Sequence, residues 1–527
     1  MIGSGDRFRQ VHVGALALAA IMLPWSEFLL SIAQFLLIGN WLLEGIVRKD
    51  LAGRFKQAFT SAPCLVFISF FALHVFGLLW TDDLGWGLDL CRILLPVIAF
   101  APVLASSSRL SNKEFRTILL LGAWSTVAST IVCLALRYDV LGRGGYRELS
   151  IFISHIRLAL LLCFSAAVFA LHWPGQLWKR VSHVLGIGWC VFFLDRLSSL
   201  LGLAILGLIN IYIIWRWSAS QPRPMRLMLR TFLLAVPIAC LGYARWCAFE
   251  YHASETMDFS RLETTSSGGE RYYNDTLNPQ HENGHFVWIQ IADGELERAW
   301  SRRSRYDYQH LDQAGQPLRS TLVRYMSSLG LRKDSIGALA LTDADIQRIE
   351  LGVSSVRTGR RDPIRARIDQ VLYEVERFRA TGNASGYSVA MRYEFLRAGW
   401  AIAKEHLLVG VGTGDTRPAF AAQYERMNSP LDERWRLRAH NEYLTLLISF
   451  GAFGLLWSLF AWLWPAWRVS ANKTPLFVCW AIVFGISCLS EDTVETQMGA
   501  TFFAFYYALL VFAAPITPAA DPPIDTR

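Results

Sequence analysis

Residues 436–464 read RLRAHNEYLTLLISFGAFGLLWSLFAWLW, a basic polar segment that runs directly into a long apolar one. The apolar part is long enough to cross the roughly 30 Å hydrocarbon core of a bilayer as a helix. His440 stands at the boundary, where an imidazole that titrates near neutral pH would face water at the membrane surface. A polar residue in this place can also simply cap or solvate the end of a helix. Its role therefore depends on the rest of the chain.

The composition is typical of a polytopic membrane protein. Of 527 residues, 53% are hydrophobic and 13% aromatic, and the mean hydropathy is +0.30. The formal net charge of +8 is not accompanied by a zinc-finger, helix-turn-helix or RNA-binding pattern. We therefore expect the lipid bilayer, with its anionic head groups, and no nucleic acid as a partner.

Apolar runs predict an all-α integral membrane protein with about 12 transmembrane helices. The runs lie near residues 12–26, 27–47, 61–80, 90–106, 115–136, 156–173, 181–195, 197–215, 230–248, 441–464, 475–490 and 498–514. A polar, arginine-rich block separates the ninth run from the tenth. The predicted domains are a membrane domain with nine spans (1–247), a soluble cap (248–439), a membrane domain with three spans (440–514) and a tail (515–527).

Basic residues indicate the orientation, because lysine and arginine are enriched in cytoplasmic loops. Loops of one parity carry Arg48, Lys49, Arg54, Lys56, Arg109, Lys113, Arg116, Lys179, Arg180, Arg216, Arg223, Arg226, Arg230, Arg468 and Lys473. Opposite loops are acidic or neutral, as in the segment 491–495, EDTVE. Both termini are therefore predicted in the cytoplasm and the soluble cap on the opposite, outer face.

One outer loop departs from this rule. The segment 137–157, RYDVLGRGGYRELSIFISHIR, carries the candidate substrate-binding residues Arg143, Arg147, His155 and Arg157. Planar guanidinium groups suit bidentate capture of phosphate oxygens, although pairing with Glu148, Asp139 or lipid head groups would equally explain them.

Arg196 is a second outer-face exception. It lies between two apolar runs, with Asp195 beside it. A charge at membrane depth is costly unless it is paired or functional, and pairing with a carboxylate is the alternative to a ligand role.

The soluble cap is predicted to be mostly helical, from apolar residues spaced three and four apart. Its segment 281–285, HENGH, has the spacing of a zinc protease motif. That motif requires a helix, whereas Asn283-Gly284 is a turn signal, so we predict a loop and no metal site. No Rossmann or Walker pattern suggests a nucleotide.

Two further arginines lie on an amphipathic segment, 391–400, MRYEFLRAGW. Arg392 and Arg397 could present cations to one cleft. The segment leads into the glycine run 409–415, VGVGTGD, a tight turn that is weak as evidence for a phosphate cradle.

Three features occur in order along the chain: Arg196 after an apolar run, the Arg392 segment leading into VGVGTGD, and HNEYL opening a span at His440. Together they resemble the O-antigen ligase and polymerase superfamily over about residues 60–512. The resemblance implies a GT-C-like bundle and a metal-independent glycosyltransferase without cofactors. It assigns diphosphate binding to Arg196 and Arg392 and an essential catalytic role to His440. The long cap and Asp195 depart from the family pattern.

The implied donor is a glycan carried on undecaprenyl diphosphate. Arginines can stabilise the leaving diphosphate, and a neutral His440 can accept the acceptor's hydroxyl proton, consistent with inversion. Glu442 and Glu394 are alternative bases. Arg397, Arg438, Asn441 and Tyr443, near the same cleft, complete the predicted substrate-binding residues.

The acceptor defines the alternatives. Our first choice is O-antigen ligation to lipid A-core, in lipopolysaccharide biosynthesis, at the periplasmic face of the bacterial inner membrane. A glycan polymerase or a protein O-oligosaccharyltransferase would use the same donor chemistry. A lipid-linked glycan transporter is a third class, disfavoured because charge gathers on one outer face rather than along the spans.

Overall fold

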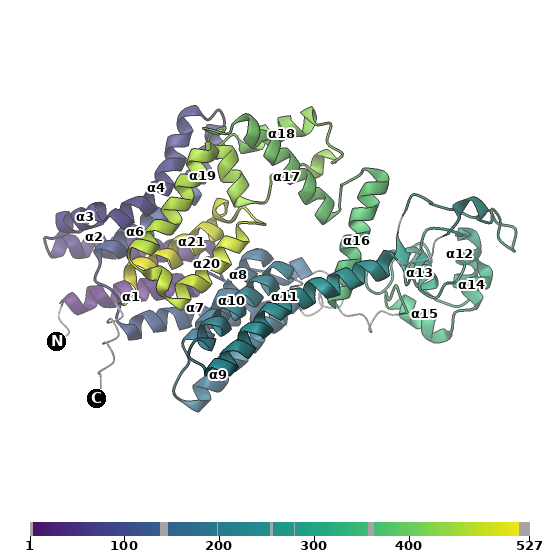
Figure 1. The fold of residues 1–527 in the computed structure, drawn as a ribbon, viewed down its shortest axis with the longest axis horizontal. Helices are drawn as coiled ribbons and strands as arrows, with labels where there is room; N and C mark the ends of the chain where they lie inside the picture. Colours follow the sequence, from purple (N-terminus) through teal and green to yellow (C-terminus); the bar gives the residue numbers. More distant parts are fainter. Residues whose placement is uncertain are drawn as a thin grey trace.

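The computed structural model describes residues 4–137, 146–197, 199–252, 257–278, 280–356 and 363–515. Figure 1 shows a helical bundle and, beyond the end of the long helix α11, a small separate body formed by α12–α15. The bundle helices are α1 (Ser4–Met22), α2 (Glu27–Val47), α4 (Ala62–Phe76), α5 (Leu84–Ile93), α6 (Leu95–Ser106), α7 (Asn112–Leu136), α8 (His155–Leu171), α9 (Leu177–Arg196), α10 (Leu200–Ser218), α11 (Arg223–His252), α19 (Glu442–Arg468), α20 (Pro475–Ser487) and α21 (Gln497–Ala508).

Helix length and composition confirm an all-α membrane protein. Within the described residues, eight helices are long and apolar enough to cross a bilayer, and three shorter apolar helices accompany them. Every predicted run falls on one of the bundle helices, while the number that cross a membrane stays a prediction. The sequence analysis missed α3 (Leu51–Thr60), a short amphipathic helix that packs on α2, α4 and α6.

Helix α19 is broken at Gly451, which has φ 66°. The connection after α17 fills the break: the Ala452 N–H donates to the carbonyl of Leu407 (2.6 Å), and the Val411 N–H donates to the carbonyl of Ile448 (2.9 Å). A side chain at Gly451 would collide with the backbone of Leu408. This requires glycine, the residue that adopts positive φ without steric cost.

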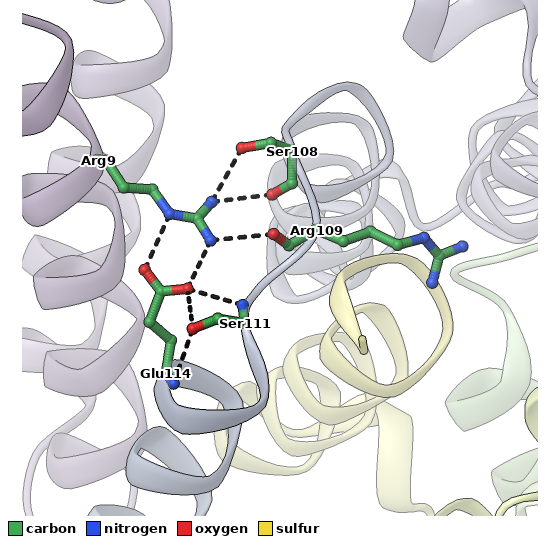
Figure 2. A network of polar contacts seen from close by, with 5 residues as sticks. All are labelled: Arg9, Ser108, Arg109, Ser111 and Glu114. Carbon is green, nitrogen blue, oxygen red and sulfur yellow. Dashed lines mark hydrogen bonds and ion pairs between the residues drawn. The ribbon is translucent and has the colours of Figure 1, made fainter. Parts of the chain in front are cut away.

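A polar network closes the end of the bundle opposite His440 (Figure 2). The guanidinium of Arg9 on α1 binds both carboxylate oxygens of Glu114 (3.0 and 2.7 Å) and the carbonyls of Ser108 and Arg109. Glu114 also completes a capping box with Ser111 at the start of α7. The network therefore joins α1 to the turn between α6 and α7.

The predicted soluble cap contains two hydrophobic cores. One lies in the small body, built from β1 (His281–Glu282), β2 (His285–Phe286), α12 (Asp293–Ser301), α13 (Leu318–Ser328), α14 (Ser335–Leu339) and α15 (Asp343–Glu350). The other is shared by α17 (Ser388–Glu405), α18 (Thr416–Arg426) and the start of α19. Helix α16 (Pro363–Thr381) packs against α11 and α17. The second core thus belongs to the bundle as much as to the cap.

The HENGH segment forms the β1–β2 hairpin, with Asn283 (φ 58°) and Gly284 (φ 91°) at its turn. Its two histidines therefore do not share a helix face, as the turn signal predicted. Short 3-10 helices lie at Gly77–Trp80, Tyr146–Leu149, Phe259–Arg261, Glu433–Trp435, Ala471–Lys473 and Thr493–Glu495, and a π-helix follows α21 at Leu509–Ala513.

Candidate functional site

Three short helices each have one end near His440. Helix α8 has 17 residues, α20 has 13, and α21 with its π-helical extension spans Gln497–Ala513. At 1.5 Å per residue these are about 20–25 Å long, less than the roughly 30 Å of a bilayer core. The start of α8, the end of α20 and the start of α21 meet the start of α19, where polar side chains from all four segments gather.

Arg157, in the first turn of α8, is the most deeply buried cation of this group, with 7% of its surface exposed. Its Nε donates to Thr496 Oγ1 (3.1 Å) and its Nη2 to the carbonyl of Asp492 (3.3 Å). Its Nη1 is buried and finds no hydrogen-bond partner among the described residues. An unsatisfied buried donor is costly, so this nitrogen has unused capacity for an anion.

Arg438 fixes the segment just before His440. It forms ion pairs with Glu495 and, at 3.7 Å, with Asp492. Burial lowers its pKa, against the opposing effects of Asp492 and Glu442. Asp492 also accepts a hydrogen bond from Thr445 Oγ1 of α19 (2.9 Å). Arg438, predicted to bind substrate, is thus engaged in internal ion pairs.

His440 has a left-handed backbone conformation, with φ 48°. Such a conformation is uncommon outside glycine, although histidine, asparagine and aspartate adopt it more readily than most residues. The ring lies 5.8 Å, centroid to centroid, from Phe395 of α17. In the described part of the chain, no hydrogen bond to the imidazole is found. Its nitrogens are therefore free to engage a substrate.

Glu491 is a partly buried carboxylate within electrostatic range of three predicted site residues. Burial is the largest influence on it and raises its pKa, and nearby Asp492 raises it further. Arg157, His440 and Arg392 act on the pKa of Glu491 in the opposite direction. Arg392 is exposed and has no hydrogen bond or ion pair within the described ranges. These three predicted residues, from α8, α17 and the segment before α19, therefore all lie close enough to the partly buried Glu491 carboxylate to act on its charge.

Other predicted residues have internal partners. Asn441 caps α19 by accepting from the Leu444 N–H (2.9 Å), and its amide donates to the carbonyl of Leu489. The Tyr443 hydroxyl donates to the carbonyl of Gly485 on α20 (2.9 Å). Arg397 pairs with the buried Glu394 at 3.2 Å.

Arg196 lies apart from this group. Its guanidinium pairs with Asp195 (2.6 Å) and stands over the ring of Phe192, and among the described residues it has no hydrogen bond or ion pair with those that act on Glu491. His155 is the first residue of α8. Arg143 lies outside the described residues, and so does the side chain of Arg147 in the Tyr146–Leu149 turn.

A comparison with protein families concerns the segment that carries most of this site. Residues 364–459 match the family described as O-antigen ligase. No match was found among curated proteins. The family match confirms the predicted resemblance and supports glycan transfer of the O-antigen ligase or polymerase type by a membrane enzyme acting on lipid-linked glycans. Arg392, Arg397 and His440 lie inside the O-antigen ligase segment, whereas Arg157 and Arg196 lie outside it.

The glycine run within the O-antigen ligase segment is packed against protein. The N–H of Gly412 donates to the Ser449 carbonyl, and the N–H of Gly414 donates to Thr81 Oγ1. A side chain at Gly414 would collide with the carbonyl of Asp83. Because these amides are already bonded, the run is not a phosphate cradle. It attaches the α17–α18 connection to the turn after α4 and to α19 just before its break at Gly451.

Glu491 and Asp492 were not predicted as site residues. Their loop served to assign the topology, and the segment 491–497 with GATFFAFYY after it also resembles a branch of the O-antigen ligase and polymerase superfamily. Glu442, ranked low as a base, is 1% exposed, and its Oε2 accepts from the Val494 N–H (3.0 Å). The sequence feature that could have identified these carboxylates is the acidic cluster just before the last predicted span, on the same outer face as the exceptional arginines.

An apolar cavity of about 660 Å³ borders the candidate site. It lies between α10 and α20, with Tyr443, Gly485 and Leu489 among its walls. Leu489 also receives the hydrogen bond from the Asn441 amide. The cavity therefore connects directly with the segment that carries His440.

Proposed function

We propose that this chain transfers a glycan en bloc from undecaprenyl diphosphate to an acceptor hydroxyl. The first choice of reaction is O-antigen ligation to lipid A-core at the periplasmic face of the bacterial inner membrane. The observation that carries the proposal is the grouping of Arg157, Arg392 and His440 around Glu491, in and beside the O-antigen ligase match.

The diphosphate and the polyprenyl tail of the donor would bind to different parts of the site. The diphosphate needs cations, and Arg157 Nη1 and the unpaired Arg392 supply hydrogen-bond donors that bind phosphate oxygens well. The polyprenyl tail needs an apolar channel, for which we propose the cavity beside Tyr443. The glycan would then lie on the water side of the arginines, next to the imidazole of His440.

In the proposed step, the acceptor oxygen attacks the anomeric carbon of the donor's first sugar from the face opposite the diphosphate. The carbon–oxygen bond to the diphosphate breaks, and the electron pair leaves with the phosphate oxygen. His440 takes the hydroxyl proton. The arginines stabilise the charge that develops on the diphosphate, as a metal ion would in other enzymes, so the step needs no metal. Because the attack comes from the opposite face, the configuration at the anomeric carbon inverts.

The reaction is tested with purified full-length protein, an undecaprenyl-diphosphate glycan donor and lipid A-core, with a chelator present throughout. We expect glycan on lipid A-core and free undecaprenyl diphosphate in equal amounts. If the donor glycan is lengthened and no ligation occurs, the reaction is polymerisation and not ligation. Binding of the donor without transfer to lipid A-core, another glycan or a peptide hydroxyl would contradict the glycosyltransferase proposal in favour of a transporter.

Replacing Arg392 with glutamine is expected to lower the transfer rate about 10- to 100-fold, because a charge-assisted hydrogen bond contributes about 1.5–3 kcal/mol. The measurement is kcat/KM for the donor. Arg426→Gln is the matched control, since Arg426 is an exposed arginine of α18 that pairs with Glu405 away from the site. Equal rates for the two variants would remove Arg392 from the diphosphate site.

Glu491 makes donor binding depend on pH. Its pKa is raised, so the carboxyl becomes neutral at a higher pH than an ordinary glutamate, and the surrounding cations are then free for the diphosphate. We expect Glu491→Gln to bind a polyprenyl diphosphate about tenfold more tightly than wild type at pH 8. The two affinities should converge as the pH falls. A constant ratio from pH 5 to pH 8 would show that Glu491 does not compete with the donor.

A further inference from the structure

A second cavity lies at the end of the bundle opposite His440, between the start of α7 and the start of α9. Its volume is about 700 Å³. Lys113, Arg116 and Lys179 line it together with the rings of Trp124 and Trp178. The cavity therefore combines three cations with an apolar wall at a membrane boundary.

These three cations have no carboxylate partner within the described part of the chain. Helices α7, α8 and α9 carry two carboxylates, Glu114 and Asp195. Glu114 is held by Arg9 and Ser111 (Figure 2), and Asp195 lies at the far end of α9, paired with Arg196. Within the described residues, no ion pair is found for Lys113, Arg116 or Lys179.

The geometry holds one of these cations in place. Arg116 Nη2 donates to the carbonyl of His172 (2.9 Å), at the end of α8, which directs the guanidinium across the mouth of the cavity. Lys179 stands 5.2 Å from the ring of Trp178. Arg116 is thus preorganised, whereas Lys113 and Lys179 are exposed and can adjust to a ligand.

The apolar wall continues into a neighbouring groove. Leu121 and Trp124 line both this cavity and a second one of about 640 Å³, where Trp25 and Leu29 lie opposite α7. Trp124 is 11 residues beyond Lys113, about 16 Å along the helix, which matches one leaflet of a bilayer core about 30 Å thick. A phosphate bound by the cations would therefore have an apolar path of one leaflet's depth beneath it.

We infer that this cavity is a binding site for an anionic diacyl phospholipid of the leaflet at this end of the bundle. The lipid phosphate would bind Lys113, Arg116 and Lys179, and an acyl chain would follow α7 past Leu121 and Trp124. The apolar path distinguishes this ligand from a free phosphate, and the uncompensated charge distinguishes it from a zwitterionic lipid. The site is independent of the proposed transfer reaction.

The test uses purified full-length protein in a neutral detergent, titrated with phosphatidylglycerol or phosphatidylcholine, with bound lipid counted by native mass spectrometry. We expect one tightly held phosphatidylglycerol. The double variant Lys113→Gln/Lys179→Gln should bind it about thirty-fold more weakly, since each cation near the membrane surface contributes about 1 kcal/mol. The matched control, Lys49→Gln/Lys56→Gln, removes the same charge at the same end but outside the cavity.

Leu121→Trp tests the acyl path separately, because it fills the apolar groove and leaves the cations in place. We expect it to weaken phosphatidylglycerol at least as clearly as the charge variant, and millimolar inorganic phosphate should not displace the lipid. The proposal is overturned if phosphatidylcholine is retained equally, if the two double variants behave alike, or if phosphate alone competes. Melting curves verify that each variant is folded.

Discussion

His440→Asn should reduce glycan transfer about 10²- to 10⁴-fold, the usual contribution of a positioned proton acceptor. Asparagine is chosen because residue 440 has φ 48°, a conformation that asparagine tolerates, so the change removes the imidazole and keeps the backbone. The neighbouring ion pairs of Arg438 and the cap formed by Asn441 do not involve the ring. The loss should therefore appear in kcat, with donor affinity largely preserved.

The control is His406→Asn, which changes an exposed histidine at the end of α17, outside the cluster around Glu491. Single-turnover transfer and donor binding are measured for both variants. If His440→Asn kept more than about a tenth of the wild-type rate, an effect below the usual range for proton transfer, the acceptor proton would go elsewhere. Glu442 and Glu491 would then be the next carboxylates to replace.

Gly451→Ala is expected to have the largest effect on stability. At φ 66° and ψ −170°, a backbone conformation essentially confined to glycine, alanine costs about 1–3 kcal/mol, and overpacking adds about 1–3 kcal/mol, so the free energy of unfolding should fall by about 2–6 kcal/mol. The added methyl group would meet the backbone of Leu408, in the segment that fills the break in α19. Transfer activity should fall as well, because the same break directs the start of α19 towards α20, where His440 lies.

Gly207→Ala is the matched control, since a methyl group on that glycine of α10 meets no atom within 4 Å. Melting temperatures in detergent are compared for the two variants. Equal melting temperatures would mean that the packing of the connection Leu407–Gly412 into the break of α19 does not contribute to stability.

The amino-acid sequence was sufficient for the helices and for part of the site. Apolar runs located every bundle helix except α5, which the run 90–106 overlaps only at its end. A segment in a bilayer must satisfy its backbone hydrogen bonds internally, so a long apolar run predicts a helix. The boundary at His440 was equally visible, as a sharp change from basic to apolar residues. The HENGH turn was correct for a local reason too, since Asn-Gly strongly favours a hairpin turn.

Local signals could not reveal the partners of those residues. Arg438, Asn441 and Arg397 were all predicted to bind substrate, and each is engaged with a protein group that the chain brings from elsewhere or from the next turn. The glycine run had the composition of an anion loop, yet its amides bond to α19 and to the turn that follows α4. Whether a donor is free for a ligand depends on contacts between distant segments.

The sequence by itself determined the class of the protein, the positions of its helices and the O-antigen ligase signature from Arg392 to His440. Only the tertiary structure decided that Arg157 joins Arg392 and His440 around Glu491 while Arg196 remains with Asp195. The physical reason is that helix formation follows from residue periodicity over a few turns, whereas a site requires four helix ends to meet. That meeting depends on the short lengths of α8, α20 and α21 and on the break at Gly451.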